Sequence, residues 1–271
     1  MSVRLEKIFI YPLKSGPGYA VEETVIVETG FEFDRFWMLV NAQGHFITQR
    51  EKPILNTLEI KLFPHGFYIY HPNRVDDFVL LNTDYKSDES IYVKIFDSEF
   101  YTEVGDQKVS NWFSEFLQEK VILTQMKPRA RIKRTDYWPI SFPINFTDGY
   151  PIHVINLESV LDVANRCGEN IHPNQFRPNI LLSGLEAYQE DHLKKLTIGD
   201  QSFSVIKKCE RCIMSTLPPH SSQFGKNPLK ILSEFRRVEN AVHFGIYLIP
   251  DPINPKIRPN IRIGDKIILE F

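Results

Sequence analysis

Short segments with alternating apolar and polar residues, separated by turn signals, fill roughly the first 105 residues of the chain. In 58–62 (LEIKL) and 91–95 (IYVKI) the aliphatic residues occupy every second position, the pattern of a strand with one buried face. Residues 36–40 (FWMLV) are apolar throughout, as expected for a strand covered on both faces. No segment before about residue 105 has a helical period. This part of the chain is therefore predicted to form a β-barrel or a β-sandwich.

The second half adds helices to the strands. One amphipathic helix is predicted from residues with i, i+3, i+4, i+7 and i+8 spacing: Val109, Trp112, Phe113, Phe116 and Leu117. A second is expected from Asn156, as the N-terminal cap, to about Cys167, with Val160, Leu161 and Ala164 facing inward. A third is expected over 229–238, and strands over 180–182, 203–206, 244–248 and 266–269. The fold class is α+β and mainly β, with two barrel-like lobes whose boundary lies near 105–125.

Charge, hydropathy and cysteine content exclude several classes of protein. Lys plus Arg number 32 and Asp plus Glu number 34, whereas nucleic-acid binders are usually strongly basic. No apolar run is long enough to span a membrane, and the N-terminus lacks the apolar block of a signal peptide. Three cysteines cannot form a fully paired disulfide framework. We therefore expect a cytoplasmic protein with no nucleic-acid and no membrane partner.

The segment Cys209-Glu210-Arg211-Cys212 has the C-x-x-C spacing, which serves several purposes. It can form half of a zinc site, but no suitably spaced second pair is evident. It can form a redox pair, although such pairs open a helix in a βαβ setting. It can also present one thiolate to a soft metal, with the neighbouring arginine lowering the thiol pKa or holding an anion. Two inert, buried cysteines are the fourth interpretation, and spacing alone does not choose among the four.

The residues around this pair resemble a known family. CERCIMST at 209–216 resembles the C-x-R-C motif of the MOSC family, named after the C-terminal domain of molybdenum cofactor sulfurase. Five further segments match that family in the same order: YPLKS at 11–15, FDRFW at 33–37, FITQREKP at 46–53, FRPNI at 176–180 and NIRIGDKI at 260–267. Within the family the chain resembles the mitochondrial amidoxime-reducing components and their bacterial counterparts. One departure is Ile246, between Gly245 and Tyr247, where the reductases commonly have Gln.

The resemblance implies a domain organisation, a cofactor and a set of site residues. Residues 1–120 would form the MOSC N-terminal β-barrel domain and residues 121–271 the MOSC domain, with molybdenum cofactor (molybdopterin) in the cleft between the lobes. Cys212 would be the molybdenum ligand, and Asp148 would line the pocket as a hydrogen-bond acceptor or proton relay. The expected cofactor-binding residues are Lys14, Ser15, Arg35, Arg177, Asn179 and Arg211, of which Asn179 is expected mainly to hold its own loop. Cys209 is expected to pack or support its loop, Cys167 to be structural, and no histidine to be a ligand.

The implied activity is the reduction of N-hydroxylated small molecules such as amidoximes and hydroxylamines. Three cysteines cannot supply the four thiolates of an iron–sulfur cluster, so the electrons are expected from a separate protein of the ferredoxin, flavodoxin or cytochrome type. The basic run 127–134 is interpreted as a solvated surface, as the docking patch for that donor, or as an entrance that guides anions. The alternatives are a cofactor or sulfur carrier without reductase turnover, and a plain zinc or redox protein.

Overall fold

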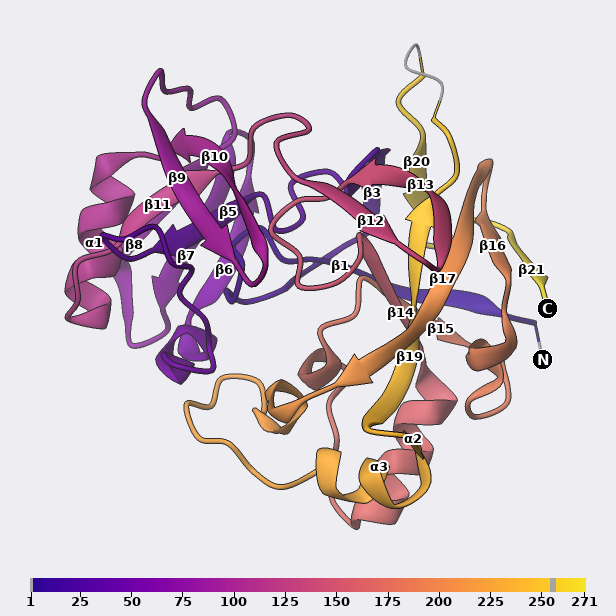
Figure 1. Cartoon of the computed structure of the whole chain (residues 1–271). Coiled ribbons are helices and arrows are strands. Elements are labelled where there is room, and N and C mark those ends of the chain that lie inside the picture. The colour runs from indigo at the N-terminus through magenta and orange to yellow at the C-terminus, as the bar shows by residue number, and fades with distance from the viewer. Residues whose placement is uncertain (1, 254–256) are drawn as a thin grey trace.

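The computed structural model describes residues 2–253 and 257–271, and strands dominate it (Figure 1). The largest sheet contains strands from both ends of the chain. Its main path runs in the order β2 (Tyr19–Val21), β1 (Arg4–Ile10), β15 (Ile180–Ser183), β14 (Ile152–Asn156), β19 (Ala241–Pro250), β17 (Gln201–Arg211), β16 (Lys195–Ile198) and β21 (Ile267–Glu270). The short strand β18 (Arg237–Val238) pairs with β19. We call this sheet and the helices on it the C-terminal lobe.

A second group of strands forms the N-terminal lobe. One sheet has the order β5 (Trp37–Val40), β11 (Ile122–Gln125), β10 (Ser98–Val104) and β9 (Ser90–Ile95). The other has the order β6 (Glu59–Phe63), β7 (Gly66–His71) and β8 (Arg74–Asn82). Helix α1 (Gln107–Leu117) lies at the outer end of this lobe and buries Val109, Phe113 and Leu117 (Figure 1). The mainly β, α+β class predicted from the alternating segments is confirmed.

The remaining elements connect or cover the two lobes. A small sheet has the order β20 (Asn260–Arg262), β3 (Glu23–Val27) and β4 (Gly30–Phe31), and β12 (Ile132–Thr135) pairs with β13 (Trp138–Pro143). Helices α2 (Leu157–Cys167) and α3 (Leu229–Phe235) pack together at one end of the large sheet (Figure 1). In the described part of the chain there are also four 3₁₀ helices: η1 (Pro53–Thr57), η2 (Pro173–Phe176), η3 (Gln189–His192) and η4 (Ile213–Thr216). No helix in the described residues is both long and apolar enough to cross a membrane.

The chain passes back and forth between the lobes, and this crossing creates the site. Strand β1 belongs to the large sheet, antiparallel to β15, before the chain enters the N-terminal lobe. Strand β20, near the other end of the chain, pairs with β3. One apolar cluster is continuous through both lobes, because strands of each contribute buried side chains to it. The division of the chain into domains at residue 120 stays a prediction.

Several predicted elements need correction. Leu161 does not face inward: its side chain is 53% exposed, and Val163 is buried instead. The orientation of α2 is set by the sheet it packs on, which selects the stripe of Ser159, Val160 and Val163. The third helix ends at Phe235, because Arg237–Val238 pair with β19 as a strand. Strand β17 is longer than predicted and extends through Cys209 to Arg211.

Candidate functional site

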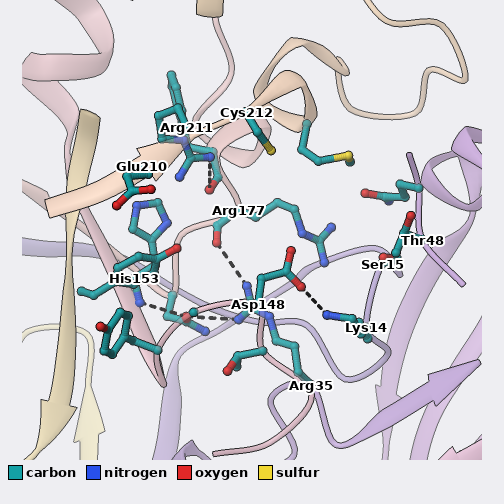
Figure 2. A pocket seen from close by; sticks show the side chains of 18 of the residues that line it. Lys14, Ser15, Arg35, Thr48, Asp148, His153, Arg177, Glu210, Arg211 and Cys212 are labelled. Atoms are coloured by element: carbon teal, nitrogen blue, oxygen red, sulfur yellow. Dashed lines mark hydrogen bonds and ion pairs between the residues drawn. The ribbon is translucent and has the colours of Figure 1, made fainter. Parts of the chain in front are cut away.

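A cavity of about 350 Å³ lies where segments of both lobes meet (Figure 2). The turn after β1 supplies Lys14 and Ser15, and the segment before β5 supplies Arg35. The loop 48–50 enters from the N-terminal lobe. The rest come from the loop before β14, β14 itself, the end of η2 with the residues after it, the end of β17, the start of η4, and β19: Thr147, Asp148, Gly149, Tyr150, His153, Phe176, Arg177, Asn179, Glu210, Arg211, Cys212, Met214 and Tyr247.

Lys14 and Asp148 form an ion pair at one wall of the cavity. The Lys14 ammonium is buried, also donates to the carbonyl oxygen of Phe146 at 2.8 Å, and lies 5.3 Å from the ring centre of Phe46. Burial lowers the pKa of Lys14, although the carboxylate of Asp148 opposes the shift. For Asp148 burial would raise the pKa, but Lys14 and then Arg50 outweigh it and hold the pKa below its ordinary value. Asp148 is therefore an anion and a hydrogen-bond acceptor at neutral pH.

Two arginines stack against the ring of Tyr11 at the base of the cavity. The guanidinium carbons of Arg35 and Arg177 lie 4.2 and 4.4 Å from the Tyr11 ring centre. Arg177 donates to the carbonyl oxygen of Gly16 at 2.8 Å. Burial, followed by the charge of Arg35, lowers the pKa of Arg177 to about 10. Both arginines have a left-handed backbone, with φ of 48° for Arg35 and 53° for Arg177. Non-glycine residues in that region tend to occur at functional sites, where the surrounding structure holds them in place.

Asn179 holds the segments that carry these arginines against the neighbouring strands. It is buried, and its Oδ1 accepts from Nη1 of Arg35 at 3.1 Å and from the backbone N–H of His153 at 3.2 Å. Its Nδ2 donates to the carbonyl oxygen of Phe9 at 3.1 Å. Asn179 thus ties the loop before β15 to β1 and β14.

The two cysteines of the C-x-x-C segment have different surroundings. Cys209 is buried, and its sulfur accepts from Nη1 of Arg211 at 3.0 Å. Arg211 also donates to the carbonyl oxygen of Phe176 at 3.0 Å, so it links β17 to η2. Cys212 is exposed and lies at the start of η4, on the cavity wall. Of the two sulfurs, Cys212 is therefore the one that an incoming ligand can reach.

Arg50, His153 and Tyr247 are among the lining residues that the sequence analysis did not assign to the site. Nη2 of Arg50 lies 3.4 Å from Oδ2 of Asp148 and 3.5 Å from the sulfur of Cys212. Burial lowers the pKa of Arg50, but the contacts with Cys212 and Asp148 outweigh it and leave the pKa raised. Tyr247 faces His153 across the β14–β19 pair, with ring centres 5.5 Å apart. The segment 46–53 contained the signal for Arg50, since it matched a family motif without a role being assigned to that residue.

The structure places all eight predicted site residues on one cavity: Lys14, Ser15, Arg35, Asp148, Arg177, Asn179, Arg211 and Cys212. Their roles toward a cofactor stay predictions. The basic run 127–134 is not uniformly a solvated surface, as one interpretation had it. Arg131 is buried and donates to the carbonyl oxygens of Asn145 and Thr147 at 3.1 and 2.7 Å, because the loop that carries Asp148 needs these donors. Arg129 is exposed and paired with Glu28 at 2.6 Å.

The lining suits an anionic, hydrogen-bonding group. Five cationic side chains line the cavity against the carboxylates of Asp148 and Glu210: Lys14, Arg35, Arg50, Arg177 and Arg211. The buried polar atoms Thr147 Oγ1, His153 Nε2 and Arg211 Nε have no hydrogen-bond partner among the residues that the structure describes. Such atoms are usually satisfied in a native complex. Within the described residues no group of three or more His, Cys, Asp or Glu side chains is placed to hold a metal ion. The residues present thus fit a phosphate-bearing cofactor approached by one thiolate.

The chain is similar to several known proteins. Mitochondrial amidoxime reducing component 2 of Rattus norvegicus is 28% identical over 97% of this chain and 82% of its own length. Molybdenum cofactor sulfurase of Oryza sativa is 29% identical over 91% of this chain but only 32% of its own length. The solved structure of the YUAD protein from Bacillus subtilis is 11% identical, with a TM-score of 0.41 over 98% of this chain and 94% of that one.

Two family descriptions together match most of the chain. The MOSC N-terminal beta barrel domain matches residues 2–120, and the MOSC domain matches residues 142–268. The second range includes Asp148, Arg177 and Cys212, and the first includes Lys14 and Arg35. Cavity residues thus come from both matched segments, and the chain belongs to the MOSC family.

Proposed function

We propose that this protein is a molybdenum-cofactor-dependent reductase of N-hydroxylated compounds, located in the cytoplasm and supplied with electrons by a separate protein. The observation that carries the proposal is the exposed sulfur of Cys212 at the edge of a cavity lined by five cations. The likeness to the amidoxime reducing component, over 97% of this chain, supports the choice of substrate class. The molybdenum cofactor, when bound, supplies the two-electron chemistry that cleaves the N–O bond.

The residues of this chain would bind the cofactor and orient it in the cavity. Cys212 would hold the metal through its thiolate, because sulfur is a soft ligand that suits molybdenum. Arg35, Arg177 and Lys14 would hold the phosphate and the pterin: the guanidinium fork suits two-point contacts, and the ammonium supplies a point charge. Arg211 is held by Cys209 and the carbonyl oxygen of Phe176, and it fixes the segment that carries Cys212.

Asp148 would act on the substrate. The pKa of Asp148 lies below its ordinary range, so the carboxylate accepts hydrogen bonds at neutral pH and is a poor proton donor. An amidoxime carries an amino group, which donates to such a carboxylate. The overall reaction consumes two electrons and two protons, breaks the N–O bond and yields an amidine and water.

The test is reduction of benzamidoxime by the cofactor-loaded protein with reduced methyl viologen as the donor. One benzamidine should form for every two viologen radicals oxidised, and Cys212→Ser should form none. Chromatography measures the benzamidine formed, and the loss of viologen absorbance measures the viologen radicals oxidised. Cofactor-loaded protein that oxidises no viologen in the presence of benzamidoxime would contradict the proposal.

A second candidate is a cofactor or sulfur carrier that performs no reduction. The 29% identity to the molybdenum cofactor sulfurase of Oryza sativa favours it, as does the accessibility of the Cys212 sulfur. A carrier should pass its cofactor to a cofactor-free molybdoenzyme, or carry a sulfur atom on Cys212 that is detected by mass as a persulfide. A reductase should turn over with the cofactor retained.

A further inference from the structure

A second cavity of about 590 Å³ lies on the other side of the segment that carries Cys212. Helix α3, η4, and β19 with the turn that joins it to β18 surround it. Glu210 and Arg211 line both cavities. Cys212 lines the first cavity, and Ile213, the next residue, lines the second. A single stretch of backbone therefore separates the second cavity from the proposed metal ligand.

The lining of the second cavity is cationic. Lys226, Lys230 and Arg237 line it and are exposed, and Arg211 is shared with the site. Among the described residues no carboxylate oxygen lies within 4.0 Å of the side-chain nitrogen atoms of Lys226, Lys230 or Arg237. The one acid in the lining, Glu210, is paired with Lys207 at 2.6 Å. These charges are thus free to meet an anionic partner.

An apolar side chain is also exposed among these cationic residues. Ile213 is 49% exposed, and Leu229 and Val242 lie beside it in the lining. Weak, transient interfaces of electron-transfer proteins are small, with buried area below about 1,200 Å². Interfaces in general combine an apolar centre with a polar rim, and opposite charges steer the encounter. Ile213 with its three surrounding cations has that composition.

The basic run 127–134 is a weaker candidate for the same task. Arg131 is buried and engaged with backbone carbonyl oxygens. Arg129 is paired with Glu28, and Lys127 donates to the hydroxyl of Ser90 at 2.6 Å. Three of the cations counted in the sequence are therefore already engaged within the protein.

We propose that the second cavity is the docking surface for the acidic electron-carrier protein that the reaction requires. This inference rests on the proposed function. In each turnover the reduced haem, flavin or iron–sulfur groups of the carrier lose two electrons in total, solvent supplies two protons, and the N–O bond breaks to give amidine and water. Docking over Ile213 brings the redox group of the carrier to the backbone next to Cys212.

The test compares two electron donors on cofactor-loaded protein with benzamidoxime as substrate. One donor is a reduced plant-type [2Fe–2S] ferredoxin, which is acidic, and the other is reduced methyl viologen. The double variant Lys226→Glu/Lys230→Glu should lower kcat/KM for ferredoxin by about tenfold or more, since steering charges act mainly on the association rate. Its rate with methyl viologen should stay within about twofold of the wild type, because the variant leaves the first cavity intact and a small donor needs no docking surface. Lys226→Gln/Lys230→Gln should fall between the wild type and the reversal.

The matched control is Lys127→Glu/Arg134→Glu, which changes the charge by the same amount on the basic run. It should reduce ferredoxin turnover little. If this control loses ferredoxin turnover and the Lys226/Lys230 reversal does not, the docking surface is the basic run and the inference is wrong. Equal losses with both donors in the Lys226/Lys230 reversal would also contradict it, because the site itself would be damaged. Wild-type protein that turns over with neither donor contradicts the proposed function, and this inference fails with it.

Discussion

Nη2 of Arg50 lies 3.5 Å from the sulfur of Cys212, although 162 residues separate them in the chain and they belong to different lobes. The contact closes the cavity between the lobes from the side of the loop 48–50. It also places a cation next to the one sulfur of the C-x-x-C segment that is exposed. The site is therefore a product of how the lobes meet, and neither lobe contains it alone.

Cys212→Ser should abolish molybdenum retention, because a serine hydroxyl stays protonated and is a poor ligand for this metal. Cys209→Ser should retain most of it, since a buried hydroxyl can still accept the hydrogen bond of Arg211. The two variants are compared by their molybdenum and zinc content per chain after gel filtration, measured by inductively coupled plasma mass spectrometry. Equal and complete loss in both would indicate a two-cysteine zinc or redox site instead.

Arg177→Ala should weaken cofactor retention by about tenfold to a hundredfold, because a charge-assisted hydrogen bond contributes about 1.5–3 kcal/mol. Arg177→Lys should also weaken it, since an ammonium cannot make the two-point contact of a guanidinium. Cofactor released during dialysis is the measurement, and thermal unfolding of the same samples checks the fold. Full retention in both variants would show that the phosphate is held elsewhere.

The residues that the sequence analysis assigned to the site line one cavity, whereas several of the residues around them were not predicted. The motifs that carry Lys14, Arg177 and Cys212 are short, and their family resemblance was enough to place all three on one cavity. Tyr247 and His153 were missed because they become neighbours only through the antiparallel register of β14 and β19. No spacing along the chain reports such a register.

The sequence also did not show which individual charged and apolar residues are buried. Arg131 is one of several basic residues in a row, and nothing in that row distinguishes the one whose guanidinium holds two backbone carbonyl oxygens. In α2, Val160 and Leu161 are adjacent, so the apolar period alone left the inward stripe uncertain by one position. The contacts of α2 with β14 and β15 decided it.

Asn56→Ala should loosen the loop after η4. Nδ2 of Asn56, in η1, donates to the carbonyl oxygens of Pro218 and Ser221 at 2.7 and 2.9 Å and so connects the lobes beside the site. Each hydrogen bond contributes about 0.5–1.5 kcal/mol, so amide exchange over 221–225 should accelerate by about tenfold. Asn41→Ala is the matched control, because Asn41 accepts only from N–H groups of its own turn. Unchanged exchange in Asn56→Ala would show that the loop is held by other contacts.

Glu190 should make the protein less stable as the pH rises through neutrality. Its side chain is fully buried; Oε2 accepts from the hydroxyl of Ser159 at 2.9 Å, and Oε1 has no hydrogen-bond partner within residues 2–253 and 257–271. Burial raises the pKa of Glu190 from 4.5 to about 7, and the hydrogen bond from Ser159 only partly opposes the shift. Between these two values the folded state binds more protons than the unfolded state, so the free energy of unfolding falls with rising pH.

The full loss is on the order of 3 kcal/mol, since one pKa unit corresponds to about 1.4 kcal/mol. This loss of unfolding free energy should be absent below pH 4.5 and complete above about pH 7. It begins at the pKa of Glu190 in the unfolded state and ends at its pKa in the folded state. Glu190→Gln has the same shape and does not titrate, so the difference in unfolding free energy between variant and wild type should grow in favour of the variant from pH 5 to pH 8. Urea unfolding at four pH values in that range measures it, with Glu115→Gln on the exposed face of α1 as the control. A difference that stays constant across the range would mean that Glu190 is ionised, and paired, in the folded protein.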